Sequence, residues 1–232
     1  LQVRRKGAAD FVTKADVAAE EAIVESLRKS RPKYGFILEE GEDTEGTDNS
    51  NRFIIDPLDG TTNFLHSIPQ FCISIALERD REPYAGVIFC PITDELFYAE
   101  HGQGAFLNER RLRVSGRNDL SEALVGTGLP FKGKPGREQA LAETDRVLSE
   151  TAGIRRFGSA AYDLCMVAMG RLDAYWERGL NPWDVAAGIV IAREAGGEVS
   201  TIEDSRDKPH LTPSILASNH HIHRDVRKLI LG

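Results

Sequence analysis

The stretch that most constrains this chain runs from Phe53 to Phe64 and reads Phe-Ile-Ile-Asp-Pro-Leu-Asp-Gly-Thr-Thr-Asn-Phe. Its three leading apolar residues predict a short buried strand that ends in the carboxylate of Asp56. Pro57 removes a backbone donor and fixes its own φ angle, so we expect the chain to turn there. Asp59 follows closely enough for both carboxylates to reach one point outside the turn.

The residues after Asp59 favour a tight turn and a helix start. Gly60 permits a tight backbone, and Thr61, Thr62 and Asn63 are good residues for opening a helix. Carboxylates attract cations whereas a helix N-terminus attracts anions, so a divalent metal with a phosphate bound to it would satisfy both. The alternative is that Asp-Pro-x-Asp-Gly forms a plain β-turn with no ligand.

A second motif, Asn181 to Gly188, reads Asn-Pro-Trp-Asp-Val-Ala-Ala-Gly. Together with Asp56 to Phe64, it resembles the paired signatures of the inositol monophosphatase family, in order and in spacing. Members of that family are magnesium-dependent, lithium-sensitive phosphatases of small phosphorylated molecules. The resemblance extends from about Gly7 to the C-terminus, and it implies the sugar-phosphatase fold of stacked helix and sheet layers.

The order of strands and helices independently predicts an α/β class, a layered α+β sandwich. Alternating patterns over 71–77, 85–90 and 95–99, followed by a hairpin over 102–114, predict an antiparallel N-terminal sheet. Helices are expected over 139–148, 161–169, 185–195 and 224–231. We expect one catalytic domain over residues 1–232, made of two packed halves of roughly 1–120 and 121–232. Family members usually carry a further helix ahead of Leu1, which this sequence lacks.

Composition narrows the classes of function. The 232-residue chain has a net charge of −7, which argues against generic nucleic-acid binding. Its three cysteines form no Cys-x-x-Cys motif, so we expect reduced, mostly buried thiols in a cytoplasmic protein. No apolar run approaches the roughly 18 residues of a membrane span. His220, His221 and His223 have no matching acids, so we interpret them as a solvated surface tract.

Five acids stand at the ends of predicted elements, and each has a structural alternative. Asp16 precedes a helix over 16–29 with Val17, Ala18, Ala22, Ile23 and Leu27 on one face and Glu20 on the polar face, so it could serve only as an N-cap. Glu39 follows the apolar strand 35–38, with a solvated acidic loop as its alternative. Asp184 could likewise be a plain N-cap. The full set is Asp16, Glu39, Asp56, Asp59 and Asp184.

If these carboxylates converge, they require a cation, because like charges repel. The set offers hard oxygen donors and no His or Cys, which selects Mg²⁺, or Mn²⁺ as a substitute, over Zn²⁺. Two ions roughly 3.5–4 Å apart, bridged by Asp56, could hold both the attacking water and the leaving oxygen of a phosphate ester.

The resemblance implies specific roles for residues. It gives one metal ion to Glu39, Asp56 and the Leu58 carbonyl, a second to Asp56, Asp59 and Asp184, and a weaker third to the neighbourhood of Glu39. It implies that Asp16 and Thr61, beside Glu39, polarise the attacking water. Substrate contacts are implied for Gly60, Thr61, Thr62, Gly158, Ser159, Ala160, Glu177 and Asp184. Close helix packing is the alternative at Ser159.

The expected activity is Mg²⁺-dependent hydrolysis of a small phosphate monoester, with myo-inositol monophosphate as the first candidate. Histidinol phosphate, fructose 1,6-bisphosphate and nucleotide 3′-phosphates are alternatives, since relatives acting on them share the metal site. Some bacterial members are instead partners of the transcription machinery, so a transcription-factor partner stays open. We expect a homodimer.

Overall fold

A computed structural model of the chain describes residues 3–7, 10–204 and 208–232, with side chains from Lys14 onward. In spatial order, the larger sheet consists of β3 (Gly35–Leu38), β4 (Asn51–Asp59), β5 (Cys72–Arg79), β6 (Glu82–Cys90), β7 (Glu95–Glu100), β8 (Gly104–Leu107) and β9 (Arg110–Arg111). The smaller sheet consists of β11 (Gly153–Arg155), β10 (Leu124–Thr127), β12 (Ala174–Arg178), β14 (Ser214–Ser218) and β13 (Glu198–Ser200). A hairpin of β1 (Val3–Gly7) and β2 (Asp10–Thr13) stands apart from both.

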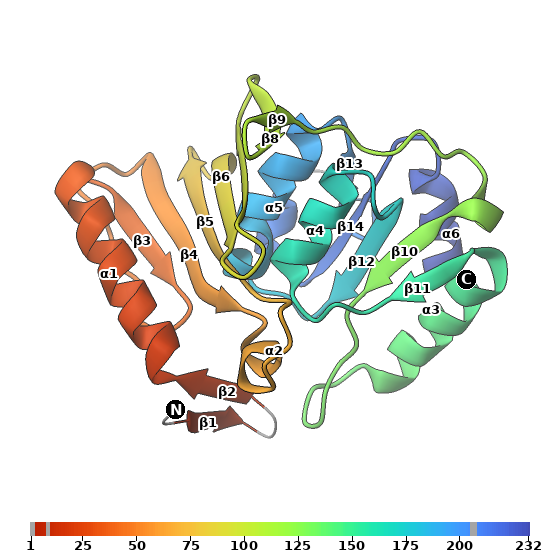
Figure 1. The fold of residues 1–232 in the computed structure, drawn as a ribbon, viewed down its shortest axis with the longest axis horizontal. Coiled ribbons are helices and arrows are strands. Elements are labelled where there is room, and N and C mark those ends of the chain that lie inside the picture. The colour runs from red at the N-terminus through yellow and green to blue at the C-terminus, as the bar shows by residue number, and fades with distance from the viewer. Residues whose placement is uncertain (1–2, 8–9, 205–207) are drawn as a thin grey trace.

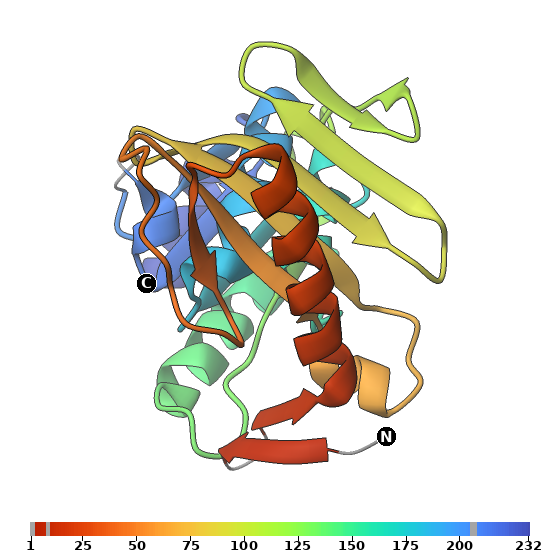
Figure 2. The same ribbon diagram turned by 90° about the vertical axis from the view of Figure 1, so that its left-hand side faces the viewer.

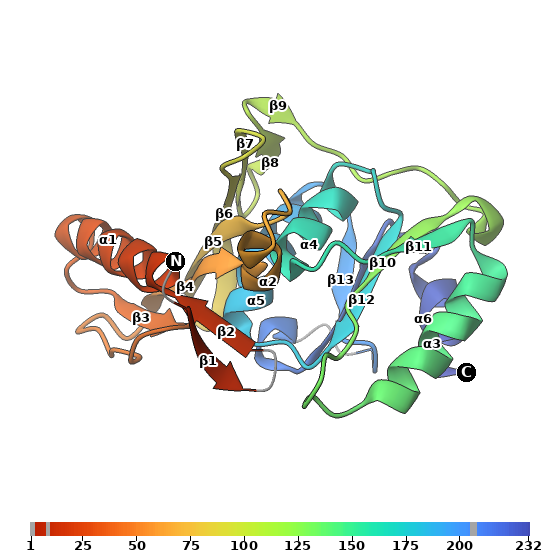
Figure 3. The same cartoon turned by 60° about the horizontal axis from the view of Figure 1, so that its bottom comes forward.

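Helices alternate with the two large sheets in layers (Figure 1). Helix α1 (Lys14–Ser30) lies across the outer face of the larger sheet, as Figure 2 shows, and α4 (Ala160–Ala168) and α5 (Pro182–Glu194) fill the space between the sheets. Helices α3 (Arg137–Glu150) and α6 (His223–Leu231) cover the far side of the smaller sheet (Figure 3). Short helices occur at α2 (Thr61–Leu65), Leu120–Glu122 and Pro209–Leu211. The predicted layered α/β fold is confirmed.

Apolar side chains explain the layers. One cluster joins α1 to β3 and β4, a second joins α4 and α5 to both sheets, and a third joins α3 and α6 to the smaller sheet. Helix α5 can approach β6 closely because Gly86 has no side chain. A Cβ at this position would lie only 2.6 Å from the Ala187 carbonyl oxygen. The three cysteines are free and buried, as expected. None of the described helices has the length and apolar character that a membrane crossing requires.

Three details of the fold differ from the sequence-based predictions. Strands β3 and β4 run parallel, so the N-terminal sheet is mixed. The other pairs of neighbouring strands in this sheet are antiparallel, as predicted. His223 is buried, whereas His220 and His221 are exposed. The buried ring of His223 is satisfied by hydrogen bonds between its two nitrogens and the Ser200 and Ser218 hydroxyls, at 3.0 and 2.7 Å. The hairpin predicted over 102–114 forms from β8 and β9 and ends at Arg111. The division near residue 120 stays a prediction.

Helix α1 is rotated relative to the predicted orientation. The helix begins at Lys14, so Asp16 lies in its first turn rather than at the N-cap. Asp16 and Glu20 are buried while Val17, Ala18 and Ala22 are exposed, since the face toward the sheet also carries these two acids.

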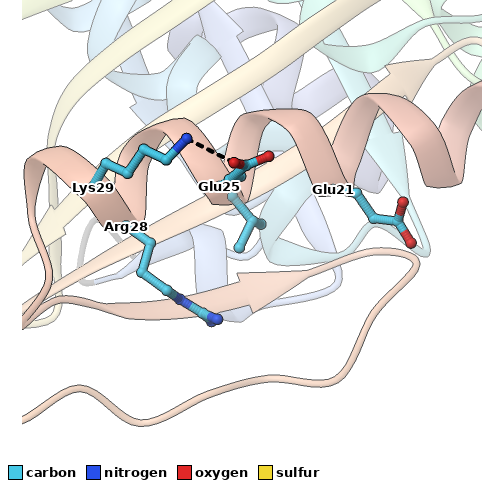
Figure 4. Close-up of a pocket in the computed structure, with 5 residues that line it drawn as sticks. Glu21, Glu25, Arg28 and Lys29 are labelled. Carbon is cyan, nitrogen blue, oxygen red and sulfur yellow. Dashed lines mark hydrogen bonds and ion pairs between the residues drawn. The ribbon is translucent and has the colours of Figure 1, made fainter.

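The flank of α1 beside this face is largely solvated. Glu21, Val24, Glu25, Arg28 and Lys29 line a shallow hollow there, and Lys29 pairs with Glu25 at 2.6 Å (Figure 4). An exposed i,i+4 pair stabilises a helix by only about 0.3–0.5 kcal/mol, so this hollow has the character of an ordinary surface.

Candidate active site

A cavity of about 730 Å³ opens where β4 and β12 end and where α2, α4 and α5 begin. It brings together residues that are more than a hundred positions apart in sequence. Of the site residues predicted from the sequence, those that line it are Glu39, Asp56, Leu58, Asp59, Gly60, Thr61, Thr62, Gly158, Ser159, Ala160, Glu177 and Asp184. The loop 128–136 and the start of α3 line its other side.

A β-bulge presents Asp56 and Asp59 to this cavity. Strand β4 does not turn at Pro57 as predicted but continues to Asp59, with Asp56 opposite Ser74 and Asp59 opposite Cys72. Two residues of β4 therefore face one residue of β5, and Pro57 is tolerated there because a bulge needs no ladder donor. The extra residue moves Asp59 to the face that Asp56 occupies, whereas regular alternation would place them on opposite faces.

The turn at Gly60 starts α2 and places Thr61 beside Asp16. Gly60 has φ 94°, and a Cβ on it would lie 2.8 Å from the Gln70 carbonyl oxygen, so only glycine fits. The Thr61 hydroxyl lies 3.1 Å from the Leu58 carbonyl oxygen and 3.4 Å from Asp16 Oδ1. The pairing of Thr61 with Asp16 links two segments that are 45 residues apart.

The start of α4 holds Asp59 in place. Ser159 Oγ and the Ala161 N–H each donate to Asp59 Oδ2 at 2.7 Å. Ser159 also caps α4 and is 2% exposed, so its hydroxyl serves the carboxylate and the helix. Asn63 Nδ2 donates to the Phe157 carbonyl oxygen at 2.7 Å, which ties this turn to α2. Helix packing, the alternative for Ser159, thus describes only part of its role.

Asp184 lies in the first turn of α5 and not at its N-cap. The N-cap is Asn181, whose backbone N–H donates to Asp184 Oδ2 at 2.7 Å. This contact fixes the carboxylate at the cavity wall. Asp184 is therefore both a helix-capping partner and a cavity residue.

Burial and mutual repulsion make these carboxylates poor at holding charge without a cation. Burial, then the charges of Glu39, Asp59 and Asp184, raise the pKa of Asp56 well above its usual range. Burial and the Asp184 charge do the same to the pKa of Asp59, against the hydrogen bonds from Ser159 and Ala161. Burial raises the pKa of Asp184 to about 6. A bound cation would reverse these shifts.

The donor set fits a hard divalent cation in an open site. Within the described part of the chain, no three Asp, Glu, His or Cys side chains form a ready-made metal cage. Mg²⁺ does not need one, since it keeps several waters and binds through one or two carboxylates together with substrate phosphate. The side chains of Glu39, Asp56, Asp59 and Asp184 and the Leu58 carbonyl at one cavity supply suitable oxygens.

Comparison with known proteins decides the family. The sequence profile of the inositol monophosphatase family matches residues 1–231. The chain belongs to this family. An inositol-1-monophosphatase of Caulobacter vibrioides is 54% identical over 228 residues, which are 97% of this chain and 89% of the relative. The Nus factor SuhB of Escherichia coli is 44% identical over 94% of this chain and 82% of its own length.

Solved structures agree with that assignment. The crystal structure of the extragenic suppressor protein SuhB from Bartonella henselae superposes with a TM-score of 0.96 at 51% identity, covering 99% of this chain and 89% of that chain. The resemblance inferred from the two motifs is therefore confirmed, and so is the inositol monophosphatase fold.

Some residues at the candidate site of this inositol monophosphatase family member carried no recognisable signal in the sequence. Glu20 was predicted on the polar face of its helix, but it is 5% exposed and accepts the Glu40 N–H at 3.0 Å. It thereby fixes the backbone beside Glu39. Its spacing from Asp16, one helical turn, could have indicated a shared face. Lys134 and Arg156 also line the cavity, and their charges partly offset the rise that burial causes in the pKa of Glu177. Short sequence motifs do not reveal these two residues as part of the site.

We expect the metal-free protein to lose stability as pH rises from about 5 to about 8. Asp56, Asp59, Asp184 and Glu177 all have raised pKa values, with Asp184 near about 6 and Glu177 near about 7. The folded state therefore binds more protons than the unfolded state in this window, and stability falls with pH. Urea unfolding in excess chelator measures this.

Glu78 sets the lowest pH at which that unfolding experiment can be interpreted. Hydrogen bonds from His210 and Arg52 outweigh burial and lower its pKa to about 2, so its contribution is lost only below about pH 4.5. Added Mg²⁺ should flatten the dependence above about pH 5. A metal-free protein whose stability stays constant or increases toward pH 8 would contradict the prediction.

Proposed function

We propose that the chain is a Mg²⁺-dependent phosphatase that hydrolyses a small phosphate monoester, with myo-inositol monophosphate as its substrate. The observation that carries the proposal is the convergence of Glu39, Asp56, Asp59 and Asp184 on one cavity beside the Thr61–Asp16 pair. Family membership and the Caulobacter relative support it. Two or three Mg²⁺ ions per site and lithium sensitivity belong to the proposal.

The chain's own residues divide the chemistry between them. Asp56, Asp59 and Asp184, with Glu39 and the Leu58 carbonyl, would hold the ions. Bound Mg²⁺ neutralises phosphate charge and lowers the pKa of a water. Asp16 and Thr61 would orient the attacking water through the hydroxyl that lies 3.4 Å from the Asp16 carboxylate. The backbone N–H groups of Gly60 and Thr61, with Thr62 beside them, would bind the phosphate at the start of α2.

The far wall of the cavity would bind the rest of the substrate. Glu177 lies there and would accept hydrogen bonds from ring hydroxyls, and the presence of Lys134 and Arg156 in the same cavity favours a polar substrate. Gly158 and Ala160 flank Ser159 in the turn before α4 and would contact the substrate ring. Ser159 itself would act mainly through its hydrogen bond to Asp59. A cytoplasmic location and a homodimer remain predictions.

Phosphate release tests the proposal. We expect purified protein with Mg²⁺ to hydrolyse myo-inositol monophosphate faster than histidinol phosphate, fructose 1,6-bisphosphate or a nucleotide 3′-phosphate. Excess chelator should abolish the reaction, Mn²⁺ should partly restore it, and lithium should inhibit it. Full activity in chelator would refute a metal-dependent mechanism. Preference for another ester in the panel would reassign the substrate only.

A second role is supported by the relatives named Nus factor SuhB. We propose it as an additional function, a partner of the transcription machinery, because identity at 44% extends over most of the chain. Co-purification with transcription proteins of the source organism, by wild type and by a catalytically inactive variant, would test it. Equal recovery by both would separate this role from the phosphatase site.

A further inference from the structure

The carboxylate of Glu177 rests on the backbone of Gly128, the first residue after β10. A Cβ at Gly128 would lie 1.8 Å from Glu177 Cδ and 1.9 and 2.0 Å from its two carboxylate oxygens. These distances are far below van der Waals contact, so any side chain at this position must displace the carboxylate. The φ angle of Gly128 is not in the left-handed region, so the constraint is space rather than backbone conformation.

Tyr175 holds the Glu177 carboxylate through a hydrogen bond. Its hydroxyl donates a short hydrogen bond to Glu177 Oε2, and its side chain is fully buried. Tyr175 and Glu177 are two positions apart on β12, so both side chains point to one face of the sheet. Tyr175 is registered against Gly126 of β10, where a Cβ would lie 3.3 Å from its ring. Because Gly126 and Gly128 have no side chains, they leave space for the side chains of Tyr175 and Glu177.

Other charged groups surround Glu177 from several elements. Burial, with a smaller contribution from the Asp184 charge, raises the pKa of Glu177 to about 7, although the Tyr175 hydrogen bond and the charges of Arg156 and Lys134 lower it. Asp163 of α4 also lies within electrostatic reach. The Tyr175 hydroxyl therefore stabilises the ionised form, which is the better acceptor for substrate hydroxyls.

We propose that Gly128 and Tyr175 are positioning residues, which hold the Glu177 carboxylate where it accepts hydrogen bonds from substrate hydroxyls and so set a preference for polyol phosphates. This inference rests on the proposed phosphatase function. It assigns the preference to the adjacent C-terminal ends of the parallel strands β10 and β12. A phosphate ester without free hydroxyls would form no hydrogen bond with the Glu177 carboxylate.

The test compares two esters in the holoenzyme, myo-inositol monophosphate and p-nitrophenyl phosphate, which has no hydroxyl groups. We expect Gly128→Ala and Tyr175→Phe to lower kcat/KM for the inositol ester about ten- to a hundredfold, mainly through KM, because a hydrogen bond to a charged group is lost. The aryl ester should change less than about threefold, and so should the Mg²⁺ concentration for half activation. Gly116→Ala is the matched control, since a Cβ there meets no atom within 4 Å.

Three further measurements separate positioning from a merely structural role. Glu177→Gln should cause the same loss, and combining it with Gly128→Ala should add little. Glu177→Asp should partly restore inositol-ester activity to Gly128→Ala, because the shorter side chain leaves room for the methyl group. In Tyr175→Phe the pKa of Glu177 should rise, so the selectivity for the inositol ester should recover as pH increases.

The outcomes are distinguishable. Equal losses on both esters, or unchanged selectivity in both variants, would overturn the inference while the phosphatase proposal stands. A wild-type protein that hydrolyses neither ester in Mg²⁺ would overturn both proposals. Tyr175→Phe removes a single oxygen atom, so it provides a folded test even if Gly128→Ala misfolds, which melting curves would reveal.

Discussion

Asp59→Asn should reduce kcat by about a thousandfold or more while leaving the metal-free protein as stable as wild type, or more stable. The carboxylate is one of the proposed metal ligands, and the charge stabilisation at such a site is worth several kcal/mol. The amide oxygen of Asn can take the position of Asp59 Oδ2 and keep both hydrogen bonds, from Ser159 and Ala161. The substitution also removes a buried charge that is repelled by Asp184.

Melting curves with Mg²⁺ and with chelator provide the control for this substitution. Mg²⁺ should raise the Tm of wild type, because a ligand bound only by the folded state stabilises it by mass action, and it should raise the Tm of Asp59→Asn less. If the motif formed only a β-turn, the substitution would cost about 1 kcal/mol irrespective of Mg²⁺. An active variant that is equally destabilised in both conditions would therefore leave the metal site without support.

The second large effect is expected at the Thr61–Asp16 pair. Thr61→Val removes the hydroxyl and keeps the shape, and Asp16→Asn removes the charge. Each should lower kcat about a hundred- to ten-thousandfold with little change in KM, because the pair is proposed to orient the water that attacks phosphorus. The double variant should be no slower than the slower single variant by more than a few-fold, since both act on one step.

Two conservative variants control for this result. Thr61→Ser keeps a hydroxyl within reach of the Leu58 carbonyl and Asp16, so it should retain most activity. Glu21→Gln changes an exposed acid on the same helix and should have no effect on kcat. Independent, additive losses in the double variant would show that Asp16 acts structurally, for example by stabilising the first turn of α1.

The sequence by itself determined the family and the fold class, and twelve of the residues that it singled out line one cavity. The two motifs around Asp56 and Asp184 are contiguous, so their content can be read without knowing the fold, and the family profile bears them out. Strands β5, β6 and β7 have alternating or apolar patterns that report directly which face is buried. The boundaries of the elements that were predicted lie within a few residues of the observed ones for the same reason, whereas strands β1, β2, β10 and β11 were not predicted.

Only the tertiary structure decided how the acids are presented. The bulge in β4 depends on its register with β5, so local turn propensity at Pro57 gave the wrong prediction. The burial of Asp16 and Glu20 depends on which face of α1 meets the sheet, because an acid at a packed face looks like a solvated one in sequence.

Contacts between distant segments were equally beyond the sequence. Ser159 reaches Asp59 across 100 residues, and Gly128 accommodates Glu177 from a neighbouring strand. A glycine in a sequence shows only that a side chain is missing, and what fills the vacated space depends on the strands packed beside it. Local patterns record the period of burial, whereas these contacts are set by register and packing between segments.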